Sequence, residues 1–231
     1  MGYQRKIQFI LLFSLAFSMC SSPIVFDEAY PQDAAPMSYF PENYQGIYMC
    51  ESDSTLVIIK ERLIYAQSFY YFEASESEIA AREQCTIGDG EIYLEERQEC
   101  IPFEYFAEDS IRAQYYNIDT LFEISSQAVL KSYESSLVLS SQLEDQWVVI
   151  VLNLDKFGNV DYRAINESSD IEKVRRITPS KQIGVNRNTE PIYSVKPDKR
   201  EFAEMFNDQS IFISCEYLMR VNQEENPFYM Y

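Results

Sequence analysis

The most informative absence from this chain of 231 residues is histidine, of which there is none. Histidine is the usual general base near neutral pH, so its absence excludes Ser-His-Asp and Cys-His nucleophilic systems. The same absence excludes zinc sites that depend on imidazole ligands. Carboxylate pairs, Ser-Lys dyads and metal sites with oxygen ligands are the enzymatic options that remain.

Glycine and positive charge are also scarce. The chain has 6 glycines against 18 tyrosines and 15 phenylalanines, a balance that suits half-buried strands. Its net charge is −18, and removal of residues 1–19 leaves 17 basic against 37 acidic residues, or −20. A surface this acidic repels phosphate backbones, so we exclude nucleic acid as a partner.

A long apolar run is missing too, although the chain opens with a short one. Arg5 and Lys6 precede an apolar run over residues 7–17, and Cys20 follows almost directly. A membrane-spanning helix needs about 20 apolar residues, so this run is too short to remain in a membrane as one. We therefore expect it to be an export signal.

The end of this segment resembles bacterial lipoprotein signal peptides, in which a cysteine that closes the apolar run receives diacylglycerol after cleavage before it. The resemblance implies a signal peptide over residues 1–19 and lipid attachment at Cys20. It further implies an exported protein anchored to a membrane of the cell envelope, the outer membrane more than the inner, facing the periplasm or the cell surface.

Two residues depart from the usual lipoprotein pattern. Phe17 stands where the family has leucine, and Met19 stands where it has a small residue. An ordinary secretory signal is the alternative, because Ala16 and Ser18 are small residues spaced for cleavage before Met19. That cleavage would release a soluble protein.

Four prolines lie between residues 20 and 45, and this density favours extended chain. We therefore predict a proline-rich tether over 20–45, followed by a single β-rich domain over 46–231. Its clearest element is 147–154, which is apolar on both faces and predicts an internal strand. A five-residue loop should join that strand to 160–165 as a hairpin.

The remaining chain alternates short β-prone runs with polar breaks, which is typical of a meander, sandwich or barrel. Runs over 111–118 and 121–125 suggest two separate strands, and the polar stretch 180–190 suggests a loop. Capping patterns predict helices near 75–84, 169–177 and 198–207. We therefore predict an α+β, mostly β fold: a bent antiparallel sheet or partial barrel with two or three short helices.

Four cysteines remain once Cys20 carries lipid, and an even number in an oxidising compartment permits two disulfides. Buried free thiols are the alternative. No Cys-x-x-Cys spacing is present, so there is no support for a zinc ribbon or a thioredoxin-type site. The candidate disulfide cysteines are Cys50, Cys85, Cys100 and Cys215.

A run of consecutive aromatic residues is the best candidate for a binding surface. Successive side chains in a strand point to opposite faces, so these rings cannot all lie in one core. The candidate partner-facing residues are Phe69, Tyr70, Tyr71 and Phe72. The sequence singles out no catalytic residue, no metal ligand and no cofactor.

Together these features predict a membrane-anchored envelope lipoprotein that is a non-enzymatic binding or assembly module. Its expected partners are the membrane, through the N-terminal lipid, and either an envelope protein or a small apolar or sugar ligand. The alternative is a histidine-free hydrolase that acts through two carboxylates. Acidic neighbours such as Glu95, Glu96 and Glu99 could supply them, but with 37 acidic residues such clusters arise by chance.

Overall fold

The computed structural model describes residues 22–81, 85–95, 98–107, 109–166, 170–186 and 189–221. The chain is mostly β, with 55% strand and 11% helix, so the predicted fold class is confirmed. Cys20 lies outside the described residues, and the signal peptide and its lipid therefore stay predictions.

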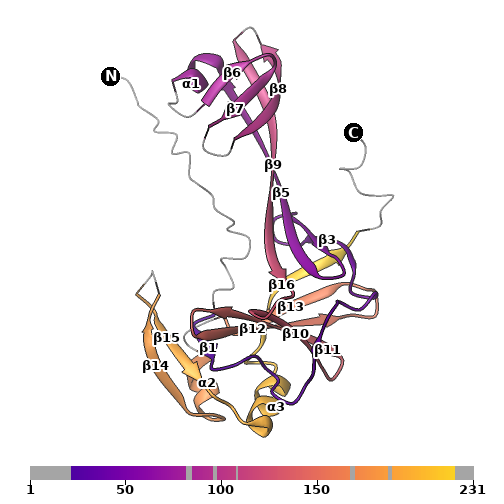
Figure 1. Ribbon diagram of the computed structural model, residues 1–231, viewed down its shortest axis with the longest axis vertical. Helices are drawn as coiled ribbons and strands as arrows, with labels where there is room; N and C mark the ends of the chain where they lie inside the picture. Colours follow the sequence, from indigo (N-terminus) through magenta and orange to yellow (C-terminus); the bar gives the residue numbers. More distant parts are fainter. Residues whose placement is uncertain are drawn as a thin grey trace. The chain divides into compact units, whose positions relative to one another are not determined.

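The strands and helices are numbered in the order in which they follow one another along the chain (Figure 1). The strands are β1 Ile24–Phe26, β2 Pro36–Met37, β3 Gly46–Cys50, β4 Leu56–Ile59, β5 Leu63–Ser75, β6 Cys85–Gly88, β7 Glu91–Leu94, β8 Glu99–Ala107, β9 Ser110–Glu123, β10 Ala128–Tyr133, β11 Ser136–Leu143, β12 Gln146–Leu154, β13 Val160–Ala164, β14 Ser180–Val185, β15 Pro191–Val195 and β16 Ile213–Arg220. The helices are α1 Glu76–Ala80, α2 Ile171–Arg175 and α3 Lys199–Asn207.

The chain forms two compact units. The main unit consists of Met1–Tyr65 and Thr120–Tyr231, and the inserted unit consists of Ala66–Asp119. The chain passes from the first to the second within β5 and returns within β9. Both boundaries lie inside regular strands with no proline- or glycine-rich linker, which is why composition predicted only one domain.

The sheet of the main unit curls into an antiparallel half-barrel. Its strand order is β14-β15-β1-β12-β13-β16-β3-β4-β5, and β11 joins at β12 and is followed by β10 and β2. The pairing of β1 with β15 is parallel, with Ile24 opposite Tyr193. The expected hairpin is confirmed, since β12 pairs with β13 antiparallel and places Leu154 opposite Val160.

The central strands β11 and β12 are covered on both faces, as the apolar run predicted. Val138 and Val151 face a core that includes Val174 of α2 and Phe202 of α3. Their neighbours along the strands, including Leu152, face a second core on the other side of the sheet. Period-two alternation between two apolar cores explains why this run has no polar face.

All three helices lie within the predicted ranges. Ser75 and Glu78 form a capping box at α1, and Asp198 and Glu201 form another at α3. These reciprocal bonds satisfy backbone N–H groups that a helix leaves without partners. The helix α2 begins after Asp170, whose side chain makes no capping hydrogen bond.

Two strand predictions need correction. The runs 111–118 and 121–125 belong to one strand, β9, because Asp119 and Thr120 continue the extended chain instead of turning. The stretch 180–190 was expected to be a loop, yet its first half is β14, which pairs with β15 at one end of the sheet. Five of the six residues of β14 are exposed, so the apolar alternation that marks a buried strand is absent.

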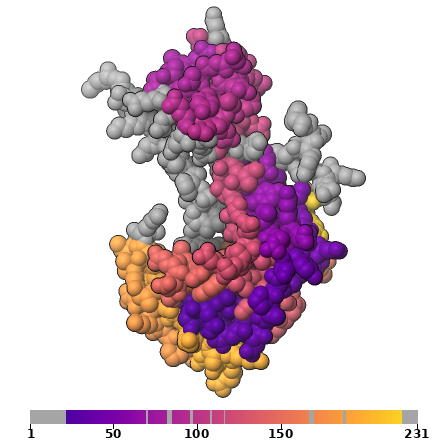
Figure 2. All heavy atoms as spheres, in the orientation of Figure 1, coloured from indigo at the N-terminus to yellow at the C-terminus, as the bar shows by residue number. Residues whose placement is uncertain are grey.

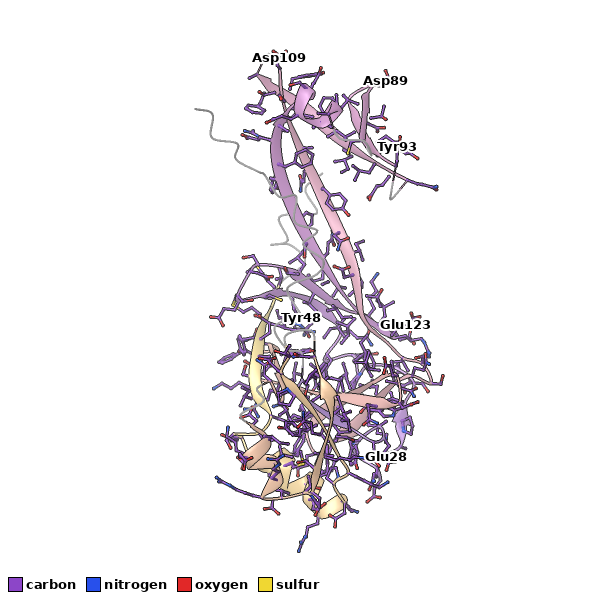
Figure 3. All side chains as sticks on the ribbon, turned by 90° about the vertical axis from the view of Figure 1, so that its left-hand side faces the viewer. Glu28, Tyr48, Asp89, Tyr93, Asp109 and Glu123 are labelled. Atoms are coloured by element: carbon purple, nitrogen blue, oxygen red, sulfur yellow. The ribbon has the colours of Figure 1, made fainter. Side chains whose placement is uncertain are left out.

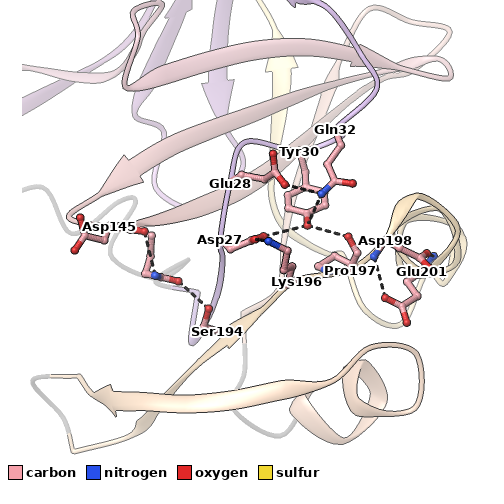
Figure 4. Close-up of polar contacts among 11 residues, drawn as sticks. Asp27, Glu28, Tyr30, Gln32, Asp145, Ser194, Lys196, Pro197, Asp198 and Glu201 are labelled. Carbon is pink, nitrogen blue, oxygen red and sulfur yellow. Dashed lines mark hydrogen bonds and ion pairs between the residues drawn. The ribbon is translucent and has the colours of Figure 1, made fainter.

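The described part of the predicted tether is not a spacer but part of the core. Ile24, Phe26 and Tyr30 are at most 1% exposed, and in Figure 2 the indigo N-terminal segment is packed against orange and yellow C-terminal segments. The Tyr30 hydroxyl donates to the carbonyl of Pro197 at 2.8 Å and lies 3.1 Å from Asp27 Oδ1 (Figure 4). The prolines occupy loops between large apolar residues, and the burial of those residues fixes the segment.

Candidate binding face of the inserted unit

Among the residues that the structure describes, the sheet of the inserted unit is packed on one face only. The sheet order continues β5-β9-β8-β7-β6, and the described pairs are antiparallel. Ile79 of α1 packs on this sheet against Ile92, Ile101 and Ile111, all of which are buried. The short helix therefore closes one face of the sheet and leaves the other to solvent.

The opposite face follows from the alternation along each strand. On β7, Ile92 is buried while its neighbours Glu91 and Tyr93 are exposed, and on β9 Ile111 and Ala113 are buried while Arg112 is exposed. Figure 3 labels Tyr93 in this sheet. The exposed residues that define this surface, the open face, are Tyr71, Glu73, Glu91, Tyr93, Glu104, Phe106 and Arg112.

Arg112 organises the charged part of the open face. Its Nη2 lies 2.7 Å from Glu73 Oε1 and its Nη1 lies 3.9 Å from Glu104 Oε1. Its guanidinium carbon lies 5.0 Å from the centre of the Phe106 ring, a cation–π distance. The hydrogen bond to Glu73, with the charge of that carboxylate, raises the pKa of Arg112. Three strands thus contribute to one charged cluster.

Aromatic rings remain exposed around that cluster. Tyr71 is 67% exposed, Phe106 is 45% exposed and Tyr93 is 39% exposed. Rings with this much exposed apolar area are frequent anchors of protein interfaces, because a partner can bury them with little loss of rotamer entropy. The open face can therefore bury apolar area against another molecule.

The inserted unit also carries more than half of the net negative charge of the chain. Residues 66–119 contain 13 acidic residues and three basic ones, with no lysine, so they carry −10 of the total −18. The other 177 residues hold 24 acidic and 16 basic residues, or −8. The field of such a surface attracts basic molecules and repels acidic ones.

The predicted aromatic run is divided between the two faces, so the prediction that Phe72 faces a partner was wrong. Tyr71 lies on the open face, while Phe72 packs against the core of the inserted unit. Phe69 is half-buried, and the side chain of Tyr70 lies outside the described residues. Tyr93 and Phe106 also belong to this face, although neither lies in the predicted aromatic run. The alternation Glu-Ile-Tyr-Leu over 91–94 could have indicated Tyr93.

The register keeps the candidate disulfide partners of the inserted unit apart. Cys85 lies opposite Leu94 of β7, and Cys100 lies opposite Tyr93 of the same strand. The two thiols are therefore two strands apart and point to opposite faces, and both are free. A disulfide needs Cα atoms within about 7 Å, so this pairing would require a different register.

Cys50 and Cys215 lie on the neighbouring strands β3 and β16, but Cys50 is opposite Leu218. An offset of three residues along a strand is roughly 10 Å, too far for a disulfide without a backbone shift. Cys50 is buried, and its burial, with the charges of Glu216 and Asp53, raises its pKa to about 12. It is therefore an unreactive thiol at neutral pH.

Other kinds of site find little support among the described residues. No group of three acidic or cysteine side chains there is placed to hold a metal ion, and no described helix is long and apolar enough to cross a membrane. Of two pockets in the main unit, one is lined by a single acidic residue, Asp33, and the other by none. Neither pocket holds the carboxylate pair that the hydrolase hypothesis requires.

Comparisons of the chain with models of protein families, with curated proteins and with solved structures returned no match.

Proposed function

We propose that this protein is an exported lipoprotein of the cell envelope, anchored through Cys20, and that its open face docks a basic protein partner. In this proposal the protein is a non-enzymatic binding or assembly module. The observation that carries it is the set of exposed rings on a sheet face of a unit with a net charge of −10.

The choice of a basic protein follows from the chemistry of the open face. Lysine and arginine side chains of a partner can pair with Glu91 and Glu104 and lie over the ring of Tyr71 or Tyr93. A neutral sugar could stack on the same rings, but the charge of the inserted unit would add nothing to its affinity. A basic protein uses both the rings and the charge.

Cross-linking at the open face tests the docking proposal. We would place a photoreactive phenylalanine analogue at Tyr71 in the full chain and irradiate intact cells. The matched control is the same replacement at Phe157, a 74% exposed ring at the β12–β13 turn of the main unit. We expect a discrete adduct with a basic protein from position 71 and none from position 157.

The charge requirement gives the second arm of this test. Reversal of Glu91 and Glu104 to lysine should reduce the yield of the position-71 adduct at least several-fold, since it removes the attraction for a basic partner. Lysine at the exposed acidic residues Glu144 and Asp145 of the main unit is the matched control and should leave the yield unchanged. Equal adducts from positions 71 and 157, or an acidic partner, would refute the docking proposal.

The anchor is tested separately. Replacement of Cys20 by serine should move the protein from the membrane fraction to the soluble fraction and abolish incorporation of labelled palmitate. Replacement of Cys100, an exposed free thiol, by serine is the control and should change neither. A Cys20→Ser protein that still sediments with membranes contradicts lipid anchoring but leaves the open face untouched.

A further inference from the structure

A second site candidate lies in the main unit, where α3 meets the ends of the central strands. A pocket of about 180 Å³ opens there between β11, β12, β13 and the chain around α3. Its lining residues are Ser135, Ser136, Val151, Asn153, Leu154, Arg163, Phe206 and Phe212. None of them belongs to the open face.

The polar lining of this pocket consists mainly of unused hydrogen-bond donors. None of the hydrogen bonds among the described residues uses a side-chain N–H of Arg163 or the amide NH₂ of Asn153, whose Oδ1 already accepts from the Ser136 hydroxyl. The guanidinium has five N–H donors in a fixed plane and no acceptor. The pocket therefore presents donors that an oxygen-rich ligand group could satisfy.

The ion pair of Arg163 leaves most of its guanidinium available. Its Nε lies 3.0 Å from Asp161 Oδ2, but the geometry makes no hydrogen bond, and Asp161 Oδ1 is also buried without a hydrogen-bond partner. A buried polar group without a hydrogen bond is costly and calls for an explanation. Asp161 orients Arg163 by charge, and the two Nη groups remain for a second anion.

Apolar side chains complete the lining, and because Val151 and Phe212 are each only 2% exposed, the half-buried Leu154 and Phe206 present the apolar surface. Phe206 and Phe212 lie on one side with their ring centres 6.5 Å apart, and Val151 lies on the sheet beneath. An apolar cavity of about 150 Å³ is large enough to hold benzene. A space of about 180 Å³ therefore fits a ring or branched chain of that size with a small polar group.

We propose that this pocket binds a small organic carboxylate with an aromatic or branched apolar body. The carboxylate accepts two parallel hydrogen bonds from the Nη groups of Arg163 and one from the Asn153 amide, and the body packs against the half-buried Leu154 and Phe206. Bidentate pairing with a guanidinium is specific for planar oxyanions. The negative charge of the chain is screened beyond about 8 Å at physiological salt, so it does not prevent this local pairing.

The unmodified protein provides the first test, with benzoate as the probe and benzamide as its neutral isostere. Binding is followed by chemical-shift changes in the ¹⁵N-labelled protein. We expect saturable benzoate binding that shifts the amides of 153 and 163, with benzamide at least about 10-fold weaker because it lacks the charge. No saturable binding of benzoate, or equal binding of both probes, overturns the proposal.

Two charge-matched variants locate the site. Arg163→Gln should lower the affinity for benzoate at least about 10-fold, because hydrogen bonds to charged groups are stronger than those between neutral groups. Lys181→Gln, at an exposed position of β14, changes the net charge equally and should leave benzoate affinity unchanged. Near-ultraviolet circular dichroism confirms that each variant is folded. Unchanged affinity in folded Arg163→Gln, or an equal loss in Lys181→Gln, also overturns the assignment.

Should Arg163→Gln fail to fold, Asn153→Ala provides the same test with a smaller change. It removes one hydrogen-bond donor and should lower the affinity for benzoate several-fold, while the charge of the pocket stays unchanged. The outcome at this pocket is independent of the cross-linking result at the open face, because the two sites lie in different units.

Discussion

At the scale of single residues, a buried lysine holds the N-terminal segment in place. Lys131 is 6% exposed, and its ammonium donates to the carbonyl oxygens of Ala29 at 2.8 Å and Pro31 at 2.7 Å. Burial lowers the pKa of this lysine, so its charge is held at a cost that the two hydrogen bonds offset. A loop with few backbone partners thus gains a fixed donor from β10.

Replacement of Lys131 by methionine should therefore destabilise the fold. The side chain keeps its approximate length, but the carbonyls of Ala29 and Pro31 lose their donor. The free energy of unfolding should therefore fall by about 1–3 kcal/mol. Lys181→Met at an exposed position should stay within about 0.5 kcal/mol of the unmodified protein. Urea denaturation of both variants measures the difference, and equal midpoints would show that Lys131 anchors nothing.

The N-terminal segment also shows why the tether prediction was wrong. Four prolines predicted an extended tether, yet the apolar side chains between them, such as Phe26 and Phe40, are buried. The burial of these side chains depends on partners that are distant in the sequence. One is Ser140, whose hydroxyl forms hydrogen bonds with the backbone of Tyr30, 110 residues away. Proline spacing is a local signal and carries no information on such partners.

At the scale of elements, the β12–β13 hairpin combines a predictable turn with an unpredictable contact. Asp155 Oδ1 accepts from the backbone N–H of Phe157 at 2.7 Å and of Asn159 at 2.9 Å, and Gly158 has a φ of 86°. These local bonds belong to the turn that the sequence predicted. The Tyr217 hydroxyl, from β16, also donates to Asp155 Oδ2 at 2.6 Å. That bond follows from sheet order and not from local sequence.

These bonds make the hairpin sensitive to acid. The hydrogen bond from Tyr217, with those from Asn159 and Phe157, lowers the pKa of Asp155 from 3.8 to about 2. A carboxylate with a lower pKa in the folded state contributes stability that is present above pH 3.8 and is lost as the pH falls through 2. Asp155→Asn should therefore lower the melting temperature at pH 7, because an amide nitrogen cannot accept from Tyr217.

The comparison across pH makes this prediction specific. The gap in melting temperature between Asp155→Asn and the unmodified protein should narrow between pH 4 and pH 2, where Asp155 itself becomes protonated. Asp145→Asn, at an exposed turn between β11 and β12, should show no such gap. A gap that stays constant from pH 7 to pH 2 would rule out the carboxylate as its cause.

Local sequence patterns could predict only part of the candidate site. Alternation within strands identified Tyr71 and the split of the aromatic run, and capping patterns located the three helices. The open face itself depends on pairs such as Glu73 with Arg112, which are 39 residues apart and meet through the sheet. The pocket joins Arg163 to Phe206 in the same way, across β13 and α3. Sequence periodicity cannot give these distances.

At the scale of the whole molecule, the two units differ in what they do for the fold. The main unit holds both large cores, while the inserted unit has a smaller one around Ile92, Ile101 and Ile111. The strands that connect the units are neighbours in the sheet order. At the main-unit end of that pair the N–H of Ile124 donates to the carbonyl of Arg62 at 3.0 Å, so the antiparallel register is set before the chain leaves the main unit.

That geometry predicts that the inserted unit can be removed without unfolding the rest. Replacement of Ala66–Asp119 by an Asn-Gly turn joins two strands that already lie side by side in antiparallel register, and Asn-Gly suits such a hairpin. We expect a cooperative urea transition with a smaller slope than in the full chain, because less surface is exposed on unfolding. Retained benzoate binding would show that the pocket at Arg163 is intact.

Deletion of Ala128–Leu143, the β10–β11 hairpin of similar local form, is the control and should abolish folding, since it removes Leu137, Val138 and Leu139 from the cores. Loss of the cooperative transition in the Asn-Gly variant would mean that the main unit depends on the inserted unit for its stability.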